Sequence, residues 1–195
     1  MKSERLQAFT DGVMAVIITI MVLEMHPPHD VTIQGLLALW PVFLSYVLSY
    51  IYVGIYWNNH HHFAHLIHEV TGGILWANLG LLFFLSLVPF TTAWAGEHGF
   101  AALPTALYGV SLLACALAWN VLQTTIMRAQ GQASVMKQAL GADGKSKISP
   151  LLYLGGIALA FFEPALSYLL YALVAALWIV PDRRIEKFLK TFERS

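Results

Sequence analysis

The first group in this sequence that could do chemistry is a carboxylate, Asp11, placed inside an apolar segment. The segment spans about residues 6 to 25, close to the ~20 residues that a helix needs to cross a bilayer. An ionisable group at that depth costs at least ~2.5 kcal/mol unless protein or water meets it, so it marks a functional site. We expect it to be buried against protein, with His60, His61 and Asn78 as partners at similar depth.

A second candidate site is a histidine cluster near the end of the second apolar segment. Three of its members share one helical face at a spacing that can bind a metal, which leaves a histidine-metal membrane enzyme open as an alternative. The other three histidines of the chain fall in loops predicted across the membrane, whereas membrane di-iron enzymes need several histidine boxes on one side. We therefore favour an interfacial helix end and expect no metal or cofactor. The cluster comprises His60, His61, His62, His65 and His68, with His61, His65 and His68 on the shared face.

The composition is that of an integral membrane protein. Of 195 residues, 58% are hydrophobic and only 11% are charged, whereas soluble domains carry roughly 25% charged residues. The formal net charge is zero and there is no basic block, which argues against a nucleic-acid partner. The single cysteine, Cys115, cannot form an internal disulfide.

Six apolar segments separated by turn residues predict an all-α protein with six transmembrane helices. We find no internal repeat and expect residues 1–195 to form a single transmembrane domain. The carboxyl tail after residue 180 is polar and is predicted to be helical. The predicted spans cover about residues 6–25, 33–57 (continuing as helix to 65), 74–94, 102–125, 150–162 and 165–180.

The basic residues predict the orientation of these spans. All eleven lysines and arginines fall in segments that a six-span arrangement places on one side, together with both termini. The positive-inside rule makes that side the cytoplasm. We expect a multi-pass protein of the plasma membrane with cytoplasmic termini.

One face of the first segment is formed by Val16, Thr19, Ile20 and Leu23. At about 100° per residue, Asp11 lies roughly 140° around the helix from Val16. If Asp11 is buried against protein, the face that contains Val16 therefore points away from that contact. The spacing alone is equally typical of ordinary helix packing, and a threonine there often bonds its own helix backbone.

Glu24 ends this first helix on the predicted outer side. Rings of acidic residues attract cations to channel mouths, although a single acid at an interface is also common. A third functional class also remains open, namely a carrier or proton-leak pathway that uses Asp11 and the histidines as a relay.

Several motifs resemble the transmembrane protein 175 family of potassium channels. The stretch Arg5-x-x-x-Phe9-Thr10-Asp11 resembles the family's Arg-x-x-x-Phe-Ser-Asp motif, with threonine in place of the usual serine. The stretch Trp57-Asn-Asn-His60-His61 is similar to the second-helix motif, and the segment around Asn78 resembles the third. The likeness covers the first three helices, and beyond them only hydropathy and spacing agree.

The resemblance implies six helices per repeat, with the first helix lining a central pore. A chain with one repeat is then expected to form a homotetramer. The pore is expected to be constricted by Val16, Ile20 and Leu23, with Thr19 one layer away; position 16 is commonly isoleucine or leucine in the family. The implied function is a potassium-permeable cation channel, not an enzyme, whose partners are its own copies, the lipid bilayer and monovalent cations.

Overall fold

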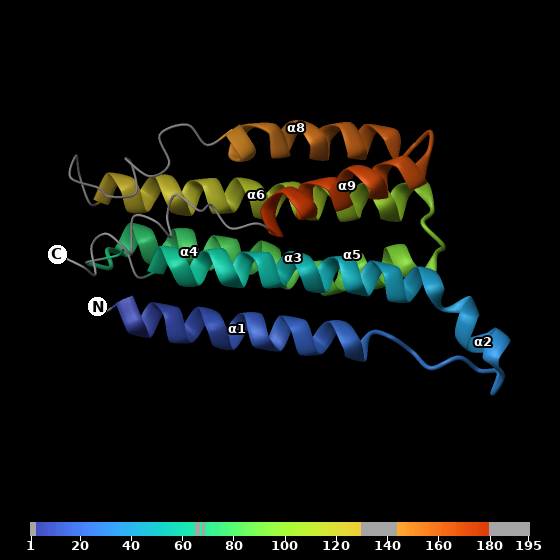
Figure 1. Ribbon diagram of the computed structural model, residues 1–195. Helices are drawn as coiled ribbons and strands as arrows, with labels where there is room; N and C mark the ends of the chain where they lie inside the picture. Colours follow the sequence, from blue (N-terminus) through green and yellow to red (C-terminus); the bar gives the residue numbers. More distant parts are fainter. Residues whose placement is uncertain (1–2, 65–66, 68, 130–143, 180–195) are drawn as a thin grey trace.

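The computed structural model describes residues 3–64, 67, 69–129 and 144–179, and within these ranges the chain forms helices and turns without a β-strand. The long segments run antiparallel in succession, so the start of α1 and the ends of α3 and α6 lie at one end of the bundle (Figure 1). His65, His68 and the predicted helical tail lie outside the described residues. The helices are α1 (Ser3–Leu23), α2 (Ile33–Ala38), α3 (Trp40–Ala64), α4 (Gly72–Ser86), α5 (Val88–Glu97), α6 (Ala102–Ala129), α8 (Gly144–Leu159) and α9 (Pro164–Ile179).

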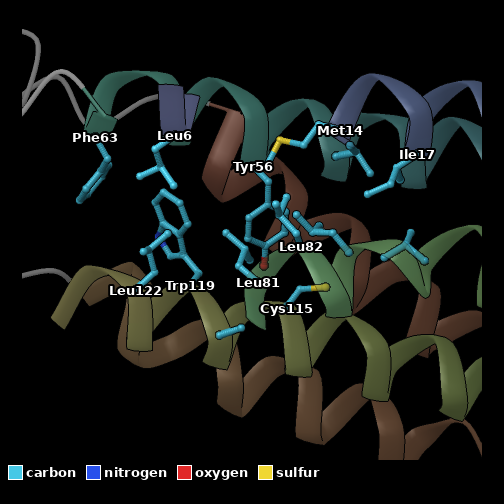
Figure 2. Packing of buried hydrophobic residues seen from close by; sticks show 14 of the residues in the cluster. Leu6, Met14, Ile17, Tyr56, Phe63, Leu81, Leu82, Cys115, Trp119 and Leu122 are labelled. Carbon is cyan, nitrogen blue, oxygen red and sulfur yellow. The ribbon is translucent and has the colours of Figure 1, made fainter. Parts of the chain in front are cut away.

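The helices form a layered bundle with α1 at one edge (Figure 1). Helix α1 packs against α3, α4 and α5, while α8 packs against α6 and α9 on the far side. A first hydrophobic core lies where α1, α3, α4 and α6 meet, and Figure 2 shows Leu6 and Met14 of α1 with Tyr56, Leu81 and Trp119. This core fixes the rotation of α1.

A second core, rich in tyrosine, joins α3, α6, α8 and α9. At its centre the fully buried ring of Tyr171 lies directly against Gly109 of α6 and Gly156 of α8. A methyl group at either glycine would overlap the ring. The two glycines therefore let α9 pack closely against both neighbours.

Two of the predicted spans are broken by proline. The second is divided into α2 and α3, because Pro41 occupies the first turn of α3, where its missing N–H costs little. The third is divided into α4 and α5 at Leu87, because Pro89 cannot donate a backbone hydrogen bond and its ring crowds the preceding turn. The predicted span from about 74 to 94 nevertheless remains one apolar segment, because α4 and α5 together form Gly72–Glu97.

The fifth predicted span starts earlier than expected. Helix α8 begins at Gly144, not at Pro150, and contains the proline within its second turn. Beside it, the Ser149 hydroxyl donates to the carbonyl oxygen of Lys145 at 2.8 Å. The first turn of α8 is polar and carries Lys145 and Lys147, so hydropathy alone does not predict that the helix begins there.

Within the described residues, three segments are long and apolar enough to cross a membrane. They are Ser3–Leu23, Gly72–Glu97 and Ala102–Ala129, and a shorter apolar helix covers Pro164–Ile179. Helix α3 has 25 residues, but its last turns contain asparagine and histidine. The structure thus supports a helical membrane protein.

Candidate functional site: the uncovered face of α1 and its polar anchor

Helix α1 has one buried face and one uncovered face. Leu6, Thr10, Met14, Ile17 and Met21 are buried, following the i, i+4 and i+3 spacing of one helical stripe. The side chains predicted to form a pore face lie on the other side. Val16 is 54% exposed, Ile20 is 40% exposed and Leu23 is 75% exposed, and Thr19 is also exposed.

The hydroxyl of Thr19 donates to the carbonyl oxygen of Val16 at 2.9 Å. Its proton is therefore used within α1, and the lone pairs of its oxygen remain available as acceptors. An otherwise apolar face thus presents one oxygen that can act as a ligand for a cation.

The buried side of α1 is held by a chain of three polar side chains from three helices. The amide nitrogen of Asn78 in α4 donates to Thr10 Oγ1 at 2.9 Å, and Asn78 Oδ1 lies 2.9 Å from Nε2 of His60 in α3. All three residues are buried, with exposures of 3% or less. Because Asn78 Oδ1 can only accept, Nε2 of His60 carries the proton and donates. The expected polar cluster joining three helices is thus present.

Asp11 is not the centre of this cluster, contrary to the prediction. It is half-buried, and it accepts a hydrogen bond from the indole N–H of Trp57 at 3.0 Å. The reason is rotational: Thr10 shares the buried stripe with Leu6 and Met14, and Asp11 lies about 100° further round. The prediction named His60 and Asn78 correctly as the members from α3 and α4, but it named Asp11 in place of Thr10 as the member from α1, and it included His61, which pairs with Gln7 instead.

The remaining motif residues occupy the same end of the bundle. Arg5 and Phe9 are exposed and border a groove between α1 and α4. His61 lies 2.6 Å from the Gln7 amide nitrogen through its Nδ1 atom. Gln7 was not predicted as a site residue, although it shares a helix face with Thr10 and Asp11 at i+3 and i+4. Glu24, predicted at the pore mouth, lies at the other end of α1, where it is exposed just after the helix ends.

A metal centre at the histidines has little support from the residues that can be placed. No three histidine, cysteine, aspartate or glutamate side chains gather as a metal site within the described ranges. Nε2 of His60 is hydrogen-bonded to Asn78. The rings of His61 and His62 contact each other, with their centroids 5.8 Å apart. His26 lies 3.7 Å from Glu97, near the α2 end of the bundle.

A second groove runs along α1 beside the break between α4 and α5. Phe9, Val16 and Ile20 line it from α1, while Ser86 and Pro89 line it from the opposite side. That the proline break would face the uncovered side of α1 could not be predicted from the sequence. The groove leaves this side of α1 accessible in the single chain.

The fold and the site define a helical integral membrane protein whose first helix presents an uncovered apolar face. The family described as "Endosomal/lysosomal potassium channel TMEM175" matches residues 5–89, which run from the first turn of α1 through α2, α3 and α4 to Pro89 in α5. The chain belongs to this family, which is a family of channels and not of enzymes.

Related proteins extend the likeness over nearly the whole chain. It is 49% identical over 190 residues to a potassium channel of Chryseobacterium sp. (strain P1-3), covering 97% of this chain and 99% of that one. It is 31% identical to a potassium channel of Chamaesiphon minutus, covering 84% and 86% respectively. The crystal structure of a lysosomal potassium-selective channel TMEM175 homolog from Chamaesiphon minutus superposes with a TM-score of 0.78 at 29% identity, covering 92% and 97%.

Proposed function

We propose that this chain is the subunit of a potassium-permeable cation channel in which the uncovered face of α1 lines the pore. The observation that carries the proposal is the division of α1 into a buried stripe anchored by Thr10 and an exposed stripe containing Val16, Ile20 and Leu23. An apolar face that the subunit itself does not cover needs lipid, another subunit or a pore. Membership of a channel family favours the pore.

The proposed assembly is a homotetramer with four α1 helices around the axis. In this arrangement Val16 forms the narrowest ring, because it is the member of the face nearest the cytoplasmic end. Four apolar side chains at one level can close a pore by excluding water, and widening the ring readmits water together with a partly hydrated cation.

Thr19 supplies the first polar ring beyond Val16. Since its hydroxyl proton is bonded to the Val16 carbonyl, each subunit offers an oxygen lone pair to the passing ion. Four such oxygens replace part of the hydration shell, which favours potassium because it holds water less strongly than sodium. Glu24, exposed at the end of α1, raises the local cation concentration at the outer mouth.

Reconstitution tests the function directly. Liposomes containing the purified protein and loaded with potassium should release it down its gradient, and protein-free liposomes should not. Flux that saturates with potassium at a low turnover would instead indicate a carrier. Retention of potassium by a correctly assembled protein would refute the channel function.

The charge distribution supports the proposed orientation in the plasma membrane. Arg5 lies at the start of α1 and Arg128 at the end of α6, which share one end of the bundle (Figure 1). Lys145 and Lys147 lie in the first turn of α8, whose start points towards this end but lies further along the bundle. These four residues are all the lysines and arginines among the described residues. We infer that this end is cytoplasmic and that six segments cross the membrane.

We predict that cysteines introduced at Asp30 or His98 react with a membrane-impermeant maleimide added outside intact cells, and that a cysteine at Lys145 reacts only after permeabilisation. The native Cys115 is fully buried and provides a low background. Labelling is read by gel shift. The reverse pattern would invert the topology, and equal labelling of all three positions would rule out a cytoplasmic α8 start.

A further inference from the structure

A small cavity lies between α3, α6, α8 and α9, away from the uncovered face of α1. It is placed towards the end of the bundle at which α3 and α6 end, because Asn59 of α3 and Asn120 of α6 belong to its lining. Aromatic rings form much of its wall, among them Tyr56 and Trp119.

The cavity has the size of a small hydration site. The volume open to water is about 30 Å³. A buried water needs at least about 10–15 Å³ by this measure, so there is room for about two waters. The space is too small for an organic molecule.

Two asparagine side chains give this cavity the polar partners that a water requires. The Asn59 amide nitrogen donates to the carbonyl oxygen of Ile55 at 2.9 Å, so its side-chain oxygen remains as an acceptor. Asn120 adds an amide that can both donate and accept. The described residues that line the cavity include no charged side chain, so an ion there would be buried without a counter-charge.

We propose that this cavity binds about two ordered water molecules, which hydrogen-bond the Asn59 oxygen and the Asn120 amide and so bridge α3 and α6. Asn120 belongs to Ala102–Ala129, one of the segments that are long and apolar enough to cross the membrane. Lipid offers no partner to an amide at that position, whereas a bound water does.

The waters join two helices that also meet through aromatic rings. Tyr56 of α3 and Trp119 of α6 contact each other edge to face, with their centroids 6.1 Å apart. Both rings belong to the core that packs against α1 (Figure 2). The water bridge therefore supports the surface on which α1 rests. Water binding does not depend on ion conduction, so it can be tested independently of the proposed channel.

The test is X-ray radiolytic labelling of the full-length protein in lipid nanodiscs, read residue by residue by mass spectrometry. Radiolysis of a bound water produces a hydroxyl radical that oxidises the side chains beside it, including those that bulk water does not reach. We expect Tyr56 to be labelled several-fold faster than Tyr108 and Tyr171. These two reference tyrosines are fully buried, and their hydroxyls lie within hydrogen-bond distance of protein oxygens.

Filling the cavity should remove this labelling. Ala116 lines the cavity, and Ala116→Val adds two methyl groups there, which take up about the space of the waters. We expect labelling of Tyr56 to fall to the level of the reference tyrosines and labelling of Trp119 to fall several-fold. Ala114→Val makes the same change at a half-buried alanine of α6 outside the cavity lining, and it should leave both rates unchanged.

A second variant covers the case in which Ala116→Val fails to fold. Asn120→Leu keeps the side-chain size and removes the amide, so it should lower the labelling of Tyr56 several-fold while the protein elutes as the native oligomer. Equal labelling of Tyr56 and Tyr171 in the unmodified protein would show a dry cavity and overturn the proposal. So would equal effects of Ala116→Val and Ala114→Val, or unchanged labelling in Asn120→Leu.

Discussion

Replacing Val16 with alanine is expected to raise the potassium current several-fold and to lower the permeability ratio of potassium to sodium. The smaller side chain widens the proposed constriction, so that water fills it more often and an ion needs to lose less of its hydration. Reversal potentials under bi-ionic conditions give the ratio, and current amplitudes in reconstituted bilayers give the conductance.

Two other substitutions in α1 make this result specific. Val22→Ala makes the same chemical change at an exposed valine that lies about 120° around the helix from Val16, and it should leave both quantities unchanged. Thr19→Val keeps the side-chain shape but removes the oxygen, so it should lower the permeability ratio or the current, whereas Thr19→Ser should have little effect. If Val16→Ala and Val22→Ala behave alike, the uncovered face does not constrict the pore.

Replacing Asn78 with leucine is expected to cause the largest loss of stability among the substitutions in the polar cluster. The change keeps the volume but leaves buried groups of Thr10 and His60 without their partner, at a cost of about 1–3 kcal/mol for each unsatisfied group. Because these three residues join α1, α3 and α4, we expect a lower thermal unfolding temperature and a larger fraction of dissociated subunits by size-exclusion chromatography.

Comparison with neighbouring positions tests the arrangement of the cluster. Asn58→Leu changes a half-buried asparagine of α3 that is outside the cluster and should be milder. Asp11→Ala removes a single hydrogen bond, the one accepted from Trp57, and this bond is more exposed than those of the cluster. Its loss of stability should therefore also be smaller than that of Asn78→Leu. In the double variant Thr10→Val with Asn78→Leu, the two losses should be less than additive. A greater loss from Asp11→Ala than from Asn78→Leu would restore Asp11 as the central residue.

Much of α1 could be predicted because its sequence combines a few polar residues with a long apolar stretch. A carboxylate and a hydroxyl at one end, followed by apolar residues, allow the two faces to be separated by helical geometry, and Val16 does lie on the uncovered side. The choice between Thr10 and Asp11 could not be made in the same way. Adjacent residues differ by only about 100° in direction, and depth along the helix does not show which of them faces the neighbouring helix.

The interior of the bundle was much harder to predict for the same reason. Helices α4 and α6 have no distinct apolar face, so periodicity does not show which side is buried. The contact of Tyr171 with Gly109 and Gly156 depends on residues from three helices. Such contacts involve residues far apart in the sequence, and no local pattern encodes them.

The hydrogen bond within α1 from Thr19 to Val16 has a consequence for biogenesis. A newly inserted subunit exposes its first helix to acyl chains before it meets its partners, and a hydroxyl donor without an acceptor would be costly there. With its proton bound to the backbone oxygen at 2.9 Å, Thr19 tolerates that environment. In the proposed channel, the same side chain can therefore face lipid in the solitary protomer and face ions after assembly, so the proposed tetramer can form from subunits that diffuse in the bilayer after translation.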